Sequence, residues 1–313
     1  MERALPGLPD VQDAARRIEG WVVRTPVVRP WAAEFPLFLK LESLQVTGSF
    51  KPRGAFNHIL RNSEACAGGV ITASSGNHGQ AVAYAARKLG LRCVVVVPED
   101  VVAAKLHVME RLGAEVIRCG HTTAERIGLA LRLAEERGLH YVPPFDDPEV
   151  IAGQGTIGLE ILDQCPEVRT VYVPCGGGGL ISGIAVAIKA LNPEVRLVGV
   201  EPEGAACFFA SWRAGRRVQL GRAETVADGL RAVEPGQLPW EIASRLVDAF
   251  TTVTEPEILS AMRWLLLEAK VVAEPSGAVS VAAALREAPQ NPSAAVVSGG
   301  NLEPVLLSSL LTP

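Results

Sequence analysis

The sequence of 313 residues has no strong excess of charge of either sign. Its 30 lysines and arginines and 34 aspartates and glutamates leave a net charge of −4 at pH 7. Nucleic acids and anionic membranes need a basic surface to attract them. The composition excludes both as principal partners, and we expect the ligand to be a small molecule.

Long apolar runs and paired cysteines are missing as well. No apolar run approaches the ~20 residues of a membrane span, and residues 1–10 lack the pattern of a secretory leader. We therefore expect a cytoplasmic protein. The cysteines form no C-x-x-C pair and have no histidine at ligand spacing, so we expect small buried thiols rather than disulfides or a zinc site. They are Cys66, Cys93, Cys119, Cys165, Cys175 and Cys207.

The sequence does contain an alternation of apolar and amphipathic segments. Runs of β-forming residues at 70–73, 93–97 and 115–118 are each followed by a helical pattern, and the alternation resumes after a proline-rich stretch at 142–148. Parallel strands buried on both faces have this pattern. We predict an α/β protein of two open, mostly parallel, three-layer αβα domains that face each other across a cleft. Later strands are predicted at 170–173, 196–200 and 294–297, and an irregular segment at 213–235.

Lysine is scarce, and one lysine occupies an unusual position. Of the six in the chain, Lys51 follows Phe50 and precedes Pro52 at the predicted start of a helix. The partial positive charge of a helix N-terminus lowers a lysine pKa, which leaves a nucleophilic amine able to form a Schiff base with an aldehyde. Taken alone, Lys51 fits a surface or capping role better. Two glycine-rich motifs elsewhere favour the reactive amine.

Four consecutive glycines lie between a predicted strand and a predicted helix. Glycine lets the backbone approach an anion closely, and the helix start offers unpaired N–H groups. A dinucleotide-binding loop does not fit, because Ile181 or Ser182 stands where G-x-G-x-x-G needs its third glycine. We predict a phosphate site, with a flexible turn as the alternative. The glycines are Gly176, Gly177, Gly178 and Gly179.

A second strand-to-helix turn contains short polar residues. Ser74, Ser75, Gly76 and Asn77 offer hydroxyl, amide and backbone N–H groups that suit capture of a substrate carboxylate, although helix capping alone would explain one of them. His78 follows, and we interpret it as structural rather than as a catalytic base.

Near the C-terminal end, Ser298 follows a predicted strand and precedes two glycines. Ligands of open α/β sheets bind at the carboxyl ends of strands. The Ser298 hydroxyl could therefore bond a heterocyclic nitrogen without fixing a proton on it, and capping of the last helix is the alternative.

These four motifs together resemble the fold-type II pyridoxal-phosphate enzymes, of the tryptophan synthase β-subunit type, and most closely the threonine/serine dehydratases and serine racemases. The resemblance covers essentially the whole chain. It implies pyridoxal 5′-phosphate as the cofactor. It also implies a smaller domain at 46–143, a larger one formed by 1–45 and 144–313, no C-terminal regulatory domain, and a homodimer or homotetramer.

The resemblance assigns roles to the motifs. Lys51 would be the Schiff-base lysine, Phe50 would pack on the pyridine ring, Asn77 would bond its 3′-oxygen, and Ser298 would face its nitrogen. The glycines 176–179 would hold the phosphate. The substrate-carboxylate loop would comprise Ser74, Ser75, Gly76 and Asn77, with Gln154 nearby.

The resemblance implies dehydration of L-threonine to 2-oxobutanoate and ammonia, and of L-serine to pyruvate. Ser75 instead resembles the serine racemases, in which a serine here is catalytic on the face opposite the lysine, so racemisation with side dehydration is the alternative. A cysteine-synthase-type β-replacement enzyme fits less well. A non-catalytic amino-acid-binding module would have no use for Lys51.

Racemase-like relatives also bind a divalent cation after the strand that ends near Val200. Glu201 matches that pattern and the carbonyl of Ala205 fits it, but Cys207 stands where the family has an aspartate. A thiol is a poor ligand for magnesium or calcium. A bound cation therefore stays an open question at this stage.

Overall fold

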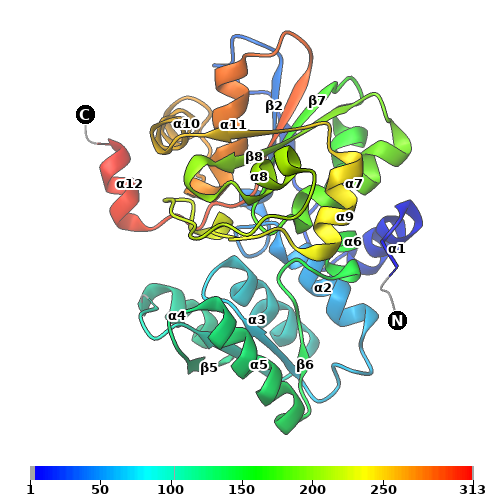
Figure 1. Ribbon diagram of the computed structural model, residues 1–313, viewed down its shortest axis with the longest axis vertical. Helices are drawn as coiled ribbons and strands as arrows, with labels where there is room; N and C mark the ends of the chain where they lie inside the picture. The colour runs from blue at the N-terminus through cyan, green and yellow to red at the C-terminus, as the bar shows by residue number, and fades with distance from the viewer. Residues whose placement is uncertain (1–3, 102, 312–313) are drawn as a thin grey trace.

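The computed structural model describes residues 4–101 and 103–311, which form two sheets with helices on both faces (Figure 1). The larger sheet has the strand order β1-β2-β10-β7-β8-β9, and the smaller has β5-β4-β3-β6. Neighbouring strands are parallel except β1 and β2, which are antiparallel. The predicted α/β class with mostly parallel sheets is confirmed.

Six strands, β3, β4, β5, β7, β8 and β10, follow the predicted runs closely, whereas β1, β2, β6 and β9 were not predicted. In the larger sheet the strands are β1 (Val27–Val28), β2 (Leu37–Leu41), β7 (Thr170–Pro174), β8 (Arg196–Pro202), β9 (Ala249–Val253) and β10 (Ser293–Val297). In the smaller sheet they are β3 (Val70–Ala73), β4 (Cys93–Val97), β5 (Glu115–Arg118) and β6 (His140–Tyr141).

Helices cover both faces of each sheet. Around the smaller sheet lie α2 (Lys51–Arg61), α3 (Asn77–Leu89), α4 (Ala103–Arg111) and α5 (Thr123–Arg137). Around the larger sheet lie α1 (Leu8–Ile18), α6 (Pro148–Gln164), α7 (Gly179–Leu191), α8 (Cys207–Ala214), α9 (Gln237–Leu246), α10 (Glu255–Leu267), α11 (Pro275–Glu287) and α12 (Pro304–Leu311). Short 3₁₀ turns occur at Glu42–Leu44, Glu203–Ala205 and Asp228–Leu230.

The alternation of side chains along each strand produces the three layers. Val95 and Val97 of β4 pack toward α2 and α3, whereas Val94 and Val96 pack toward α5. In the larger sheet Ala295 and Val297 of β10 face α10 and α11, whereas Ala294 and Val296 face α6 and α7. Both faces are buried, which explains why these strands are apolar throughout.

The proline-rich crossing between the sheets is fixed by two consecutive aspartates. Asp146 accepts hydrogen bonds from the amides of Gln237 and Leu238 at 2.9 and 3.0 Å, at the start of α9. Asp147 caps α6 by accepting from the amides of Glu149 and Val150, both at 3.0 Å. The crossing therefore has a defined path between the two sheets.

Several expectations about single segments can now be compared with the structure. The six cysteines are free, and five of them are buried. The segment 213–235 is irregular apart from the 3₁₀ turn at Asp228–Leu230 and the last helical residues of α8, as predicted. Within residues 4–101 and 103–311, no helix is both long and apolar enough to cross a bilayer. The predicted domain limits include residues 1–3 and 312–313, which lie outside the described residues.

Candidate active site

Lys51 is the first residue of α2 and lies at the junction of the two sheets. Its Nζ donates a hydrogen bond to the carbonyl of Pro144 in the crossing segment at 2.7 Å, and lies 5.1 Å from the centroid of the Phe50 ring. Burial lowers the pKa of Lys51 from 10.5 to about 8. The sequence predicted a lowered pKa from the helix N-terminus, but the cause that acts here is desolvation.

The end of β10 lies directly against the residues that precede Lys51. The Phe50 amide donates to the Ser298 carbonyl at 3.0 Å, and Ser49 pairs with Gly299 as an isolated bridge. Ser298 is 4% exposed, and its hydroxyl donates to the Ser276 carbonyl at 3.3 Å. The structure thus brings Ser298 next to Phe50 and Lys51, although Ser298 follows them in the chain by about 250 positions.

Asn77 joins this group through its side-chain amide. Its Nδ2 donates to Glu274 Oε1 at 2.6 Å, and its Oδ1 accepts from Asn301 Nδ2 at 2.7 Å. The Glu274 amide in turn donates to the Gly299 carbonyl at 3.0 Å. Asn77 therefore has a fixed orientation at the end of β10, and one N–H of its amide group is left for a ligand.

Glu274 and Asn301 are site residues that the sequence did not indicate. Glu274 precedes Pro275 at the start of α11, so its only sequence signal was that of an acidic residue before a helix. Gly299 shows how close the packing is, because a Cβ there would collide with Glu274 Oε1.

The loop before α3 is open on its outer side. Ser74 Oγ accepts a hydrogen bond from the Gly76 amide at 3.3 Å. The Ser75 hydroxyl forms no hydrogen bond with any other residue in the described part of the chain, and a Cβ at Gly76 would meet nothing within 4 Å. These groups are half-buried and open on one side, and their binding of a substrate carboxylate stays a prediction.

His78 differs from its neighbours in this loop. It is 4% exposed and its Nε2 donates to the Val142 carbonyl at 3.0 Å. Burial, together with the charge of Lys51, lowers the pKa of His78 to about 3. A histidine this weakly basic is a poor proton acceptor at neutral pH, which supports the interpretation of His78 as structural.

The glycine loop, residues 176–179, turns from β7 into α7 between two phenylalanine rings. A Cβ at Gly177 would lie 2.5 Å from the Phe145 ring, and one at Gly178 would collide with Phe208. Gly178 also has φ +94°, a conformation that side chains other than glycine rarely adopt. The close approach of the backbone to both rings requires glycine here.

The same loop meets the requirements of a phosphate site. Its carbonyls are engaged, since Gly177 accepts from the Gly236 amide at 3.1 Å and Gly176 from the Cys207 thiol at 3.8 Å. None of its four amides donates to an acceptor within residues 4–101 and 103–311. Unpaired amides at a helix N-terminus bind a phosphate well, so the residues present fit a cofactor with a phosphate group.

Gln154 occupies a buried position in α6. It is 1% exposed and packs against Gly54, and its Oε1 has no hydrogen-bond partner in the structure. Among the described residues, no hydrogen bond joins Gln154 to the Ser74–Asn77 loop. Its role toward substrate stays a prediction.

The residues of the implied cation site do not fit a hard divalent cation. Glu201 is fully buried, and its carboxylate accepts from the amides of Phe208 and Phe209 at 2.9 and 2.7 Å. Burial raises the pKa of Glu201 to about 8 and also raises that of the Cys207 thiol. A carboxyl group held by two amides beside a protonated thiol is a structural arrangement, and no cluster of three candidate ligands occurs among the described residues.

Comparison with known proteins agrees with this geometry. The family model described as "Pyridoxal-phosphate dependent enzyme" matches residues 18–299. An L-threonine ammonia-lyase of Thermotoga maritima is 43% identical over 97% of this chain and 78% of its own. The structure of maize serine racemase superposes with a TM-score of 0.94 at 37% identity over 98% of this chain and 97% of that chain. Threonine deaminase isoform 2 from Solanum lycopersicum gives a TM-score of 0.91 at 32% identity over 99% of this chain and 98% of that chain.

The chain therefore belongs to the pyridoxal-phosphate-dependent enzymes. Its fold is that of fold type II, shared with the serine racemase and threonine deaminase structures. The expected fold and cofactor are confirmed.

Proposed function

We propose that this protein is an L-threonine ammonia-lyase, which converts L-threonine to 2-oxobutanoate and ammonia and also converts L-serine to pyruvate. The observation on which the proposal rests is Lys51, a half-buried amine whose one hydrogen-bond partner in the described structure is the Pro144 carbonyl. The names of relatives such as the Thermotoga maritima enzyme support the substrate.

The residues of the chain have separate tasks in this proposal. The amides of the glycine loop would hold the cofactor phosphate, Ser298 would face the ring nitrogen, and Lys51 would hold the aldehyde carbon. When bound, the cofactor supplies an electron sink for the carbanion that forms at the substrate α-carbon. Ser74 and Asn77 orient the substrate carboxylate so that the α-proton points toward Lys51.

Once the amino group of the substrate has released Lys51 as a free amine, Lys51 Nζ would remove the α-proton of the substrate. With a pKa of about 8, about a tenth of a free Lys51 amine is unprotonated at pH 7, whereas an ordinary lysine would be almost fully protonated. A neutral hydroxyl at Ser298 leaves the cofactor ring less positive than a carboxylate would. This favours prompt loss of the β-hydroxyl over a long-lived carbanion.

The proposal is tested by mapping the cofactor attachment and by assay of product. Borohydride treatment of the holoenzyme should label Lys51, and L-threonine should yield 2-oxobutanoate. Lys51→Ala should abolish turnover and retain the fold, whereas Lys88→Ala, at an exposed lysine of α3, should leave turnover unchanged. A label on another lysine, or activity in Lys51→Ala, contradicts the proposal.

Serine racemase is the second candidate, because the Ser75 hydroxyl is free of hydrogen bonds within the described chain and lies in an open loop. A hydroxyl on the face opposite Lys51 could return a proton to the α-carbon and invert it. Ser75→Ala should then abolish formation of D-serine but only modestly lower formation of pyruvate from L-serine.

Ser74→Ala is the matched control for this experiment. Its hydroxyl belongs to the same loop but is assigned to the carboxylate, so both products should fall together. If pyruvate falls as far as D-serine in Ser75→Ala, Ser75 is not specific for one face. If the wild type makes D-serine faster than pyruvate, racemisation is the main activity.

We also propose that residues 46–143 form the smaller domain, and 1–45 with 144–313 the larger, which the two separate sheets support. Assembly as a homodimer or homotetramer in the cytoplasm rests on the resemblance to the family alone. Light scattering of the purified protein tests the assembly, and limited proteolysis near residues 46 and 143 tests the domain limits.

A further inference from the structure

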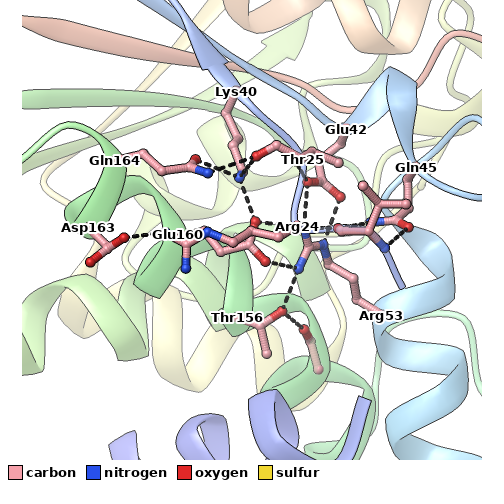
Figure 2. Close-up of polar contacts among 12 residues, drawn as sticks. Arg24, Thr25, Lys40, Glu42, Gln45, Arg53, Thr156, Glu160, Asp163 and Gln164 are labelled. Atoms are coloured by element: carbon pink, nitrogen blue, oxygen red, sulfur yellow. Dashed lines mark hydrogen bonds and ion pairs between the residues drawn. The ribbon is translucent and has the colours of Figure 1, made fainter. Parts of the chain in front are cut away.

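A buried network of two cations and two carboxylates lies beside the first turn of α2, the helix that begins at Lys51 (Figure 2). Lys40, Glu42 and Arg53 are fully buried, and the side chain of Glu160 is 13% exposed. Lys40 belongs to β2, Glu42 to the 3₁₀ turn after it, Arg53 to α2 and Glu160 to α6. The four charges cancel, as a buried group of this kind requires.

Arg53 is the centre of the network. Its Nε and Nη2 each donate to Glu42 at 2.8 Å, and its Nη1 and Nη2 donate to Glu160 at 2.6 and 2.9 Å. Further bonds reach Thr156 Oγ1 and the Val23 carbonyl. Burial alone would lower the pKa of Arg53, but Glu42 and Glu160 outweigh it and raise the pKa. Paired bonds on both sides fix the position of the planar guanidinium group.

Arg53 and Lys51 project from opposite sides of the first turn of α2. They are two residues apart, which at 3.6 residues per turn is a rotation of about 200°. Lys51 therefore points toward the site, and Arg53 points away from it into the network. This turn has no side-chain cap at Phe50 to hold it.

The backbones of α2 and α6 touch at the same point. A Cβ at Gly153 of α6 would lie 2.5 Å from the Arg53 carbonyl, and one at Gly54 would collide with Gln154. Close backbone contact limits how near α2 can approach α6, and the bonds of Arg53 prevent it from moving away. Together they leave the first turn of α2 a single position.

We propose that Arg53 is a positioning residue for Lys51: through its two carboxylate partners it fixes the turn from which the lysine amine reaches the substrate. The inference rests on the proposed function of Lys51. A shift of about 1 Å in a reacting group can lower a rate about 100-fold. Loss of the Arg53 bonds should therefore lower kcat more than it affects KM.

The experiment compares Arg53→Met with Lys40→Met. Each variant removes one positive charge from the same buried network, so both should lower the melting temperature. Lys40, however, belongs to β2, and among the described residues none of its hydrogen bonds reaches α2. Arg53→Met should lower kcat about 100-fold with KM within about threefold, whereas Lys40→Met should keep kcat within about threefold of wild type. Arg53→Lys, which retains the charge but cannot form both paired contacts, takes its place if Arg53→Met does not fold.

The second measurement needs no bound cofactor. Acylation of Lys51 in the apoprotein, mapped by mass spectrometry over a range of pH, should have a midpoint near 8 in wild type and in Lys40→Met. Both Arg53 variants should move the midpoint upward, toward the ordinary lysine value of 10.5, because a displaced turn exposes the amine.

Two outcomes overturn the inference. One is an equal fall in kcat for the Arg53 and Lys40 variants, and the other is an unchanged midpoint for Lys51 in the Arg53 variants. Failure of the proposed function is recognised separately, because borohydride would then label a lysine other than Lys51 in the wild type.

Discussion

Removing the charge of Lys51 should make the apoprotein more stable. The burial that lowers the pKa of Lys51 disfavours its protonated form in the folded state, and in the structure one carbonyl, that of Pro144, partners the amine. The substitution Lys51→Met keeps the length of the side chain and removes this cost. A gain in stability on replacing Lys51 would indicate that the residue serves activity at the expense of the stability of the fold.

The magnitude follows from the pKa. The unfolded chain binds this proton below about 10.5 and the folded chain only below about 8. The free-energy cost of burying the protonated Lys51 amine is therefore complete below pH 8 and absent above pH 10.5. The stability of the wild type accordingly rises with pH between these values. A difference of about 2.5 in pKa corresponds to at most about 3 kcal/mol at pH 7. Partial exposure of Lys51 and loss of its bond to Pro144 reduce the net gain to about 1–2 kcal/mol.

Urea unfolding of apoprotein at pH 7 and pH 10 measures this gain. Lys51→Met should exceed wild type by about 1–2 kcal/mol at pH 7 and by less than about 1 kcal/mol at pH 10. The control is Lys88→Met, at an exposed lysine of α3, which should show no such change with pH. A destabilised Lys51→Met at pH 7, or a gain that does not decline with pH, would refute the reasoning.

Three further results are expected. Millimolar Mg²⁺ should not raise the melting temperature of the wild type, because both carboxylate oxygens of Glu201 already accept hydrogen bonds from backbone amides. A rise would show that a cation site exists. In equilibrium dialysis, pyridoxal should bind the apoprotein at least about 3 kcal/mol more weakly than pyridoxal phosphate, because it lacks the charged hydrogen bonds to the glycine loop. Equal binding would exclude that loop as the phosphate site. Glu274→Ala should weaken cofactor binding by about 1–2 kcal/mol, because the side-chain amide of Asn77 loses the hydrogen bond that orients it, and Glu274→Gln should restore part of that binding. An equal loss of binding in both variants would assign the effect to packing.

The order of strands and helices was largely predictable, because buried parallel strands are apolar over their whole length. Of the strands that were not predicted, β2 shows most clearly why a local pattern can fail. It contains Lys40 in the middle of an apolar run, which in a sequence suggests an exposed segment. Its place beside β10 depends on Glu160 and Gln164, which accept hydrogen bonds from Lys40 across 120 and 124 positions. No local pattern contains that information.

The site was predictable where a motif has its own local chemistry. The lysine at a helix start, the glycine loop and the serine after β10 are each recognisable in a few residues. Glu274 and Asn301 are not, because their contribution is to orient Asn77, and that requires three separate segments to meet. Ser75 is intermediate: the motif located it, and the structure shows that its hydroxyl is not used in capping.

A comparison of two lysines shows why we propose a reactive role for only one of them. Burial lowers the pKa of both Lys40 and Lys51, so a lowered pKa alone does not identify a catalytic amine. Lys40 donates to three acceptors, Glu160, Gln164 and the Thr25 carbonyl, and the carboxylate partly restores its charge. Among residues 4–101 and 103–311, Lys51 has a single carbonyl partner and no carboxylate near enough to influence its pKa. The same burial therefore gives a structural cation at Lys40, whereas at Lys51 it leaves an amine that can lose its proton near neutral pH, as the proposed reaction requires.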